Sequence, residues 1–428
     1  MANDWLIRSL GDVLNFANGK TSPERTNDGK YCVFGSNGPI GQSEFKNAPK
    51  DTIIVGRVGS YCGSTFFSKL ECWVTDNAIR ANAKEGSDAR FAYYLLQTLN
   101  LNERRAGSGQ PLLNQSILSS IDVVVPPPEE QRAIAHIIGT LDDKIELNRR
   151  ANETLEAAAL ALFKGWFVDF EPVRAKLEGR WQPGQSLPGL PAHLYDLFPD
   201  RFVESELGEV PEGWEHIPFG SLLESTIGGD WGKDAPEDDH NQVVSIIRGT
   251  DFPDVSSGGI GKVPTRYTSA KKLASRQLQA GDIVLEISGG SPTQPTGRSI
   301  FISESTLERF SNAVVCASFC RRFQPKNRGL GALAFMHLQH LYAAGGTWKY
   351  QNQSTGIANF QTTRFLESEM VAMPSAVLLN FFAAQAQSLL EKMSSNENLA
   401  LVKLRDTLLP KVISGELRVH DAERILGA

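Results

Sequence analysis

The chain has few cysteines and no long apolar run. Its five cysteines, an odd number, are scattered at positions 32, 62, 72, 316 and 320, which favours reduced thiols over a disulfide framework. No stretch approaches the roughly 18 consecutive apolar residues that cross a bilayer, and the opening MANDWLIRSLGDV lacks the basic and apolar regions of a secretory signal. We therefore expect a cytoplasmic protein with no membrane-spanning segment.

Motifs that bind nucleotides are also missing. A phosphate-binding loop of the GxxxxGK[ST] type needs a glycine five residues before Gly19, and Leu14 stands there. No GxGxxG motif opens a helix after a predicted strand. These absences argue against a nucleotide-driven motor, and we expect no cofactor.

One candidate metal site can be composed from the sequence. Cys316 and Cys320 lie four apart in a predicted strand, where both would face one side, and His337 and His340 lie three apart on a predicted helix. A CxxxC spacing on a strand is unlike the usual zinc knuckle, and buried free cysteines are common. We therefore interpret all five cysteines as core thiols and expect no metal.

Size and composition predict several globular domains. A chain of 428 residues with 41% hydrophobic content can bury two or three cores. The net charge of −6 argues mildly against a nucleic-acid partner, although a negative total does not exclude a local basic face.

A long helix is predicted in the middle of the chain, in PPPEEQRAIAHIIGTLDDKIELNRRANETLEAAALALF (126–163). Prolines and two glutamates favour a helix start, and no further proline occurs before Pro172. Alternating steps of four and three describe a heptad seam, formed by Ile134, Ile138, Leu141, Ile145, Asn148, Asn152, Leu155, Ala159, Leu162 and Trp166. A seam of this length favours a coiled coil over the alternative of one amphipathic core helix, and seam asparagines are typical of register-setting positions.

The chain also repeats itself, which supplies a partner for this helix. Four pairs of segments resemble one another in the same order: 10–20 and 219–229, 51–67 and 282–301, 75–83 and 310–318, and 107–128 and 354–375. A proline-free apolar run follows each member of the last pair, and the second run predicts a helix from about Ala376 to Leu409. We infer a globular unit, a long helix, a second globular unit and a second long helix.

Within the globular units the predicted elements are short and mixed. Strands are predicted in DTIIVGRVG (51–59), SIDVVVP (120–126), GDIVLEIS (281–288) and SNAVVCASFCRRF (311–323), and helices in DARFAYYLLQTL (88–99) and LGALAFMHLQHLY (330–342). Residues 171–214 are dense in proline and glycine, which predicts a connector rather than a core. Each unit is therefore expected to be α+β.

Two stretches resemble a known family. VVVPPPEEQRAIAHIIGTLDDKIELNRRANETLEAAALALFKGWFVDF (123–170) resembles the central conserved region of the specificity subunit of type I restriction-modification systems, and NLALVKLRDTLLPKVISGEL (398–417) resembles its C-terminal counterpart. The entry to the second helix, AMPSAVLLNFFAAQAQ, lacks the PxxEQ form of the first.

The resemblance implies an α+β fold with two tandem target recognition domains, separated by two long helices that form an antiparallel coiled coil. The implied boundaries are 1–125 for the first recognition domain, 126–170 for the central helix, 171–214 for the connector, 215–375 for the second recognition domain, and 376–428 for the C-terminal helix and tail.

The same resemblance implies a non-catalytic subunit that recognises double-stranded DNA. Each recognition domain would recognise one half of a split, asymmetric site, while the helices space the domains and bind two methyltransferase subunits, through which restriction subunits join. A helix from Glu129 to Trp166 would be roughly 57 Å long, comparable to about 17 base pairs. The chain lacks the Asn-Pro-Pro-aromatic run of amino-methyltransferases, which disfavours a fused modification enzyme; a non-catalytic coiled-coil scaffold is the other alternative.

Candidate DNA contacts are polar residues in glycine-rich loops, where the backbone can approach phosphates closely and side chains can reach base edges. In the first unit they are Lys20, Thr21, Ser36, Asn37, Arg57, Ser60 and Tyr61; in the second they are Trp231, Lys233, Arg248, Ser291, Gln294 and Arg298. Arg104, Arg105 and the loop AGSGQPLLNQS (106–116) form a second tier. A methyltransferase-binding surface is predicted from apolar residues beside the seam: Ile137, Leu147, Leu160, Phe163 and Phe167.

Overall fold

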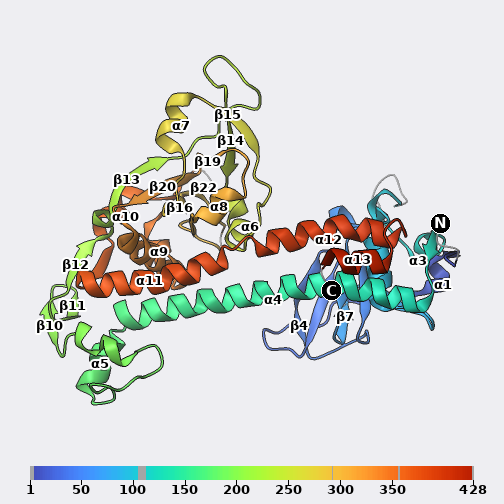
Figure 1. Cartoon of the computed structure of the whole chain (residues 1–428), viewed down its shortest axis with the longest axis horizontal. Helices are drawn as coiled ribbons and strands as arrows, with labels where there is room; N and C mark the ends of the chain where they lie inside the picture. Colours follow the sequence, from blue (N-terminus) through green and yellow to red (C-terminus); the bar gives the residue numbers. More distant parts are fainter. Residues whose placement is uncertain (1–3, 105–111, 292, 355–356, 427–428) are drawn as a thin grey trace. The chain divides into compact units, whose positions relative to one another are not determined.

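The computed structural model describes residues 4–104, 112–291, 293–354 and 357–426. Its contacts divide the chain into two compact units: the first is Met1–Ile145 with Leu401–Ala428, and the second is Glu146–Ala400. Both units combine β-sheets with helices (Figure 1), which confirms the predicted α+β class with long helices. Within the described residues, no helix is both long enough and apolar enough to span a membrane.

Among its described residues, the first unit contains three small sheets. A four-stranded antiparallel sheet has the order β2 (Leu14–Asn18), β8 (Ala78–Ala83), β5 (Thr52–Gly56) and β6 (Thr65–Ser68). A three-stranded sheet has the order β4 (Gly38–Ser43), β3 (Tyr31–Gly35) and β7 (Cys72–Val74), with β3 and β7 parallel. The antiparallel ribbon is β1 (Leu6–Ser9) with β9 (Asp122–Val125). The helical elements are α1 (Leu10–Val13), η1 (Gly59–Tyr61), α2 (Ala89–Gln97), η2 (Leu101–Arg104) and α3 (Gln115–Ser119).

The second unit repeats this arrangement with additions. Its four-stranded sheet has the order β13 (Leu223–Gly228), β20 (Cys320–Pro325), β16 (Ile283–Glu286) and β18 (Ser299–Phe301). Its three-stranded sheet has the order β15 (Thr265–Thr268), β14 (Gln242–Ile247) and β19 (Ala313–Cys316). Its antiparallel ribbon is β12 (Glu215–Pro218) with β23 (Met370–Met373). The added strands are β10 (Phe202–Ser205) with β11 (Gly208–Pro211), and β17 (Ser288–Gly289) with β22 (Ile357–Phe360) and β21 (Gln351–Ser354). The shorter helical elements are α5 (Glu171–Leu177), η3 (Ala192–Leu197), η4 (Phe219–Leu222), η5 (Gly249–Asp251), α6 (Phe252–Ser256), α7 (Ala270–Arg276), α8 (Glu304–Glu308), α9 (Arg328–Ala343), η6 (Gly346–Tyr350) and α10 (Thr362–Ser368).

The repeat extends to single hydrogen bonds. The amide of Gly19 donates to the carbonyl of Ala78 at 3.0 Å, and the amide of Gly229 donates to the carbonyl of Cys320, also at 3.0 Å. A Cβ at Gly19 would lie 2.0 Å from the Thr75 carbonyl oxygen, and one at Gly229 would lie 2.1 Å from that of Ala317. Both copies therefore need glycine here because another backbone approaches too closely for any side chain.

One sequence pairing was wrong by seven residues. Aligning 75–83 with 310–318 placed Ala78 opposite Ala313, whereas the hydrogen bonds above make Ala78 equivalent to Cys320. The error arose because residues 311–323, predicted as one strand, form β19 and β20 in two different sheets.

Cys316 and Cys320 therefore do not share a strand, and a backbone turn separates them. Both are fully buried, and burial raises the pKa of each thiol, to about 12 for Cys316. His337 is hydrogen-bonded to Glu369 at 2.9 Å. Among the described residues, no group of three or more His, Cys, Asp or Glu side chains is placed to hold a metal ion.

The long helices are α4 (Pro128–Phe167), α11 (Ala376–Met393) and α12 (Glu397–Ile413), followed by α13 (Val419–Leu426). In the first unit, the α4 residues Ile134, Ile138 and Leu141 are buried in one core with Leu408 and Val412 of α12. In the second unit, α4 joins α11 through an apolar cluster that includes Ala159, Phe163, Trp166, Phe382 and Ala386.

Two of the predicted seam residues, Asn148 and Asn152, make polar contacts with residues of α12 and α11. Asn148 donates a hydrogen bond to Glu397 Oε2 at 2.9 Å, and Asn152 donates to the Met393 carbonyl at 3.0 Å. The remaining predicted seam residues Ile145, Leu155 and Leu162 are half-buried. The apolar surface predicted beside the seam is largely wrong: Ile137, Phe163 and Phe167 are core residues and Leu160 is half-buried, which leaves Leu147, 61% exposed.

The sequence predicted one continuous second long helix from about Ala376 to Leu409, but this helix is interrupted. It ends at Met393 and restarts at Glu397. Ser394 caps the end of α11, and its hydroxyl returns to the Leu390 carbonyl at 2.8 Å. Serine and asparagine side chains compete for backbone partners, so the run Ser394-Ser395-Asn396 favours an interruption.

Residues 171–214 are also more than the connector that the sequence predicted. Trp181 is 1% exposed, and Leu194 and Phe198 are fully buried in the same cluster as Trp166. Prolines and glycines set the turns of this segment, but its aromatic and leucine side chains anchor it to the core of the second unit.

Candidate nucleic-acid interface

In the first unit, the loops that carry the predicted DNA contacts meet at the turn Asp76–Asn77, between β7 and β8. The amide of Lys20 donates to the Val74 carbonyl, and the amide of Arg57 donates to the Asn77 carbonyl, both at 3.0 Å. The hydroxyl of Ser36 also donates to the Asn77 carbonyl. Three loops far apart in sequence are thereby held on one turn.

Their side chains differ in how freely they could contact a ligand. Lys20, Thr21, Asn37, Ser60 and Tyr61 are exposed, with Tyr61 48% exposed at the end of η1. The loops are held close, because a Cβ at Gly56 would lie 2.3 Å from the Tyr61 carbonyl oxygen and 2.7 Å from that of Ser36.

Arg57 is half-buried among these loops. Its Nη1 lies 3.4 Å from the Asp76 carbonyl oxygen, a long hydrogen bond. Its Nε is buried and has no hydrogen-bond partner within the described part of the chain. A guanidinium with unused donors at a loop junction retains the capacity to bind an acceptor on a ligand.

The second unit builds the equivalent junction at residues 317–319, between β19 and β20. The amide of Asp230 donates to the Cys316 carbonyl at 2.9 Å, and the amides of Ile287 and Ser288 donate to the Phe319 carbonyl at 2.9 and 3.2 Å. The loops that converge there carry Trp231 and Lys233 after β13, Arg248 after β14, and Ser291, Gln294 and Arg298 between β16 and β18.

In the second unit, two residues predicted to contact DNA bind carboxylates of the protein itself. Arg248 binds Asp251 through two hydrogen bonds of 2.8 and 2.9 Å, and Arg298 binds Glu286 through two of 2.8 Å. Both carboxylates are buried. Burial raises the pKa of Asp251, but hydrogen bonds from Arg248 outweigh burial and lower it. Paired forks of this kind position loops, and they use Nε and Nη2 of each guanidinium.

The other predicted residues of the second unit are exposed. Lys233 forms an ion pair with Glu237 at 3.4 Å, and Ser291 and Gln294 close a tight turn through backbone hydrogen bonds. Trp231 is stacked by the guanidinium of Arg266, whose Cζ lies 4.6 Å from the ring centroid. Arg266 also donates to the Trp231 carbonyl and pairs with Asp234, so it holds this loop in place.

Sequence reasoning missed the turn residues at which the loops meet. Asp76 and Asn77 mark the turn of the first unit, and Phe319, 60% exposed, marks that of the second. The signal was present as polar or small residues inside the runs TDNAI and CASFC, but a single strand was predicted across the second run. Of the second-tier residues, Arg104 is exposed at the end of η2, and Arg105 with the loop to residue 111 lies outside the described residues.

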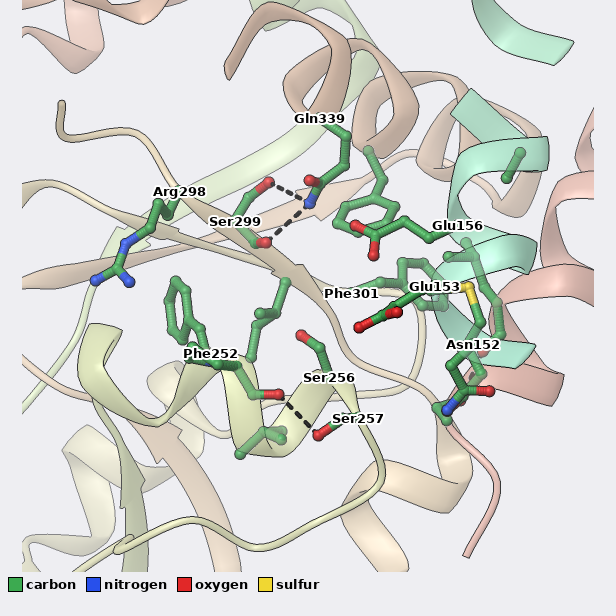
Figure 2. Close-up of a pocket in the computed structure, with 18 of the residues that line it drawn as sticks. Asn152, Glu153, Glu156, Phe252, Ser256, Ser257, Arg298, Ser299, Phe301 and Gln339 are labelled. Atoms are coloured by element: carbon green, nitrogen blue, oxygen red, sulfur yellow. Dashed lines mark hydrogen bonds between the residues drawn. The ribbon is translucent and has the colours of Figure 1, made fainter. Parts of the chain in front are cut away.

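A cavity of about 510 Å³ lies in the second unit between α4 and the sheet-bearing part (Figure 2). Asn152, Glu153 and Glu156 of α4 line one side, and Phe252, Ser256 and Ser257 line another. Gln339 donates to the Ser299 carbonyl at 2.9 Å along its wall. Burial raises the pKa of Glu156. The cavity is mainly apolar, and Arg298, one of the predicted DNA contacts, is among its lining residues.

Comparison with known proteins gives one consistent set of matches. The family model described as "Type I restriction modification DNA specificity domain" matches residues 2–157. The specificity subunit of the type I restriction enzyme HindI from Haemophilus influenzae is 30% identical over 363 residues, which cover 74% of this chain and 73% of that protein. The MjaIX specificity subunit from Methanocaldococcus jannaschii is 26% identical over 354 residues, covering 79% and 71%. The crystal structure of a type I restriction-modification S subunit from M. genitalium has a similar fold, with a TM-score of 0.54 at 16% identity over 96% of this chain and 97% of that one.

Proposed function

The chain belongs to the family of type I restriction enzyme specificity subunits, and we propose that it recognises a bipartite, asymmetric double-stranded DNA site without modifying or cutting DNA itself. The sheet-bearing part of each unit recognises one half-site through the loops that meet at residues 76–77 or 317–319. The observation that carries this proposal is the repeated loop junction, because the same backbone arrangement presents different side chains in its two copies.

The differences between the copies support an asymmetric site. By the hydrogen-bond equivalence, Lys20 corresponds to Asp230, which is paired with Lys272 at 2.9 Å. Thr21 corresponds to Trp231, and Asn77 corresponds to Phe319. A lysine and an asparagine suit phosphate and adenine contacts, whereas exposed aromatic rings suit apolar and stacking contacts with bases. Two half-sites of different sequence follow.

The long helices serve as the spacer between the half-sites, as an antiparallel coiled coil. Four contacts, each within one unit, support the antiparallel direction: Glu130 with Arg418, Asp142 with Arg405, Asn148 with Glu397, and Asn152 with Met393. As the residue number along α4 increases, the residue number of its partner decreases, as expected for antiparallel chains. The polar pairs of Asn148 and Asn152 set the register, because a one-turn slip would leave their amides without partners on the seam.

The same helices bind the methyltransferase subunits, and restriction subunits join through that complex. This part of the proposal rests on the family, since specificity subunits are named as components of type I restriction enzymes. Leu147, exposed midway along α4, is the apolar residue best placed to contact a partner.

The test is sequencing of modified bases in DNA from cells that carry this chain with its methyltransferase. We expect modification at one split motif with two unlike halves and a constant spacer. The purified chain alone should bind DNA without cutting or methylating it. Methylation by the chain alone would favour a fused modification enzyme, and a complex without salt-dependent DNA binding would favour a coiled-coil scaffold.

A further inference from the structure

Arg309 lies immediately after α8 and joins the sheet-bearing part of the second unit (residues 215–373) to the interruption between α11 and α12. Its Nε donates to Asn396 Oδ1 at 2.8 Å, and its Nη2 donates to the Ser394 carbonyl. Its Nη1 donates to the carbonyls of Val255 at 2.7 Å and Gly259 at 3.1 Å, at the end of α6. One guanidinium thus bridges two separate parts of the unit.

The chemistry of this bridge is unusual for a half-buried arginine. All four acceptors are neutral oxygens, and two of them are carbonyls at the C-terminal ends of α6 and α11, where the helix dipole is negative. Burial lowers the pKa of Arg309 to about 10, so the side chain stays charged at neutral pH. The charge is therefore held by the ends of two helices, and its position depends on both.

The neighbouring contacts reinforce the same junction. The hydroxyl of Ser305 donates to the Ser394 carbonyl at 2.7 Å. Gly258 has φ +93°, and a Cβ there would lie 3.0 Å from the Ser395 carbonyl oxygen. The loop after α6 therefore lies against the interruption so closely that glycine is required on steric and conformational grounds.

The second attachment of the sheet-bearing part lies elsewhere and is mainly apolar, with one hydrogen bond from Gln387 Nε2 of α11 to the Arg328 carbonyl of α9 at 3.3 Å. Helix α9 packs on α11 in the main core, through residues such as Leu333, Leu338 and Phe382. The lining of the cavity includes Phe335 and Met336 of α9, together with Val255 and Ser394. Apolar contact is not directional, so the α9 attachment alone leaves rotation about α11 weakly constrained.

The first unit provides an internal comparison. Lys69, in the connection between β6 and β7, pairs with Asp143 of α4, and Arg90 donates to Asp143 and to the Gly139 carbonyl. The equivalent connection of the second unit, between β18 and β19, carries Arg309. In both copies, a cationic side chain from this connection contacts a long helix or its end. The acceptor is the Asp143 carboxylate in the first unit, whereas in the second unit the acceptors lie at helix ends.

We propose that Arg309 is a positioning residue that fixes the angle at which the sheet-bearing part of the second unit stands on α11 and the interruption that follows it, and thereby the spacer length that the chain accepts between half-sites. The inference rests on the proposed function and adds to it. On this basis the spacer length depends on helix length and also on this bridge.

The test uses the full chain in complex with its methyltransferase, on duplexes whose two half-sites are separated by spacers of successive lengths. We expect Arg309→Gln to reduce the preference for the native spacer over its immediate neighbours by about tenfold, the factor that corresponds to one net hydrogen bond. Arg309→Lys should retain part of the preference, because an ammonium keeps the charge but reaches fewer of the four oxygens. Lys392→Gln, an exposed residue of α11 two positions before Ser394, is the control with the same charge change and should match the wild type.

Either of two results for Arg309→Gln overturns the proposal. An unchanged spacer profile in Arg309→Gln would show that the bridge does not set the angle, and an equal loss of rate on every spacer would indicate a general loss of stability or of DNA contact. If Arg309→Gln does not fold, Asn396→Ala removes one acceptor of Arg309 and Ser305→Ala removes the neighbouring hydrogen bonds to Ser394, and unchanged profiles in both overturn the proposal. A wild-type complex with no spacer preference would instead overturn the proposed function, and this inference with it.

Discussion

The buried carboxylate of Glu369 allows a quantitative test of how much its charge interactions stabilise the second unit. Its carboxylate is 9% exposed and accepts hydrogen bonds from Tyr350 at 2.6 Å and His337 at 2.9 Å, with Lys349 Nζ at 2.8 Å. Burial raises the pKa of Glu369, but these three partners together outweigh burial and lower it from 4.5 to about 2. At about 1.4 kcal/mol per pH unit, this depression stabilises the folded unit by about 3 kcal/mol at neutral pH.

The sign of the pH dependence follows from the direction of the shift. Because the folded state holds the ionised carboxylate more strongly than the unfolded chain does, the stabilisation is complete above pH 4.5 and is lost as the pH falls towards 2. Glu369→Gln should therefore lower the melting temperature at pH 7 by about 6–10 °C, since about 3 kcal/mol corresponds to this range in a unit of about 250 residues. The difference from the wild type should shrink steadily below pH 4.5.

The assay is thermal unfolding followed by tryptophan fluorescence from pH 7 to pH 3. Glu367→Gln, an exposed residue two positions earlier, removes the same charge and should leave the melting temperature unchanged at every pH. A Glu369→Gln variant that is destabilised equally at pH 7 and pH 3 would refute the electrostatic argument and assign the loss to packing. No destabilisation at pH 7 would refute the burial argument as well.

Three further predictions concern the repeat and the spacer. Gly19→Ala and Gly229→Ala should each destabilise their own unit by about 2–4 kcal/mol in denaturant unfolding, because a carbonyl oxygen occupies the Cβ position. Gly165→Ala on α4, with open space around it, should stabilise the protein by up to about 1 kcal/mol. Equal effects at all three positions would contradict the steric reasoning. Replacing residues 1–106 with the equivalent part of another specificity subunit should change one half of the modified motif in a methylome, and a change in both halves would contradict independent recognition. Deleting Ile145–Ala151 together with Glu397–Lys403 should shorten the spacer by about 10 Å, or about three base pairs; an active complex with the original spacing would show that the helices are not the spacer.

The sequence sufficed for the elements whose signal is periodic or local. The heptad steps located α4 and the asparagines on its seam, and the buried residues Ile134, Ile138 and Leu141 lie where the period placed them. Segment similarity also located the repeat, since the strand orders of the two units agree. Periodicity could not show that α11 ends at Met393, because the stabilising partner of that interruption, Arg309, lies 85 or more residues away in the chain.

The candidate interface shows a second limit of sequence reasoning. Glycine-rich loops were correctly expected to approach other backbones closely, and Gly19, Gly56 and Gly229 do so. The chemical identity of a loop, however, depends on what its side chains already bind. Arg248 and Arg298 were chosen as base contacts, yet each lies in a two-pronged contact with a buried carboxylate.

These arginines differ from Arg57 in what their side chains already bind. An arginine that is satisfied by a neighbouring carboxylate contributes to the rigidity of the loop, and exchanging it would alter every contact that the loop makes. Arg57 keeps a buried Nε without a partner among the described residues, beside the exposed Tyr61 and Ser60. The exposed side chains of Ser60 and Tyr61 can change without disturbing the junction, because the backbone hydrogen bonds and close approaches at Gly19, Gly56 and Asn77 do not involve them. On the proposed function, exchange of such exposed side chains would change a half-site while the two units keep the same strand order.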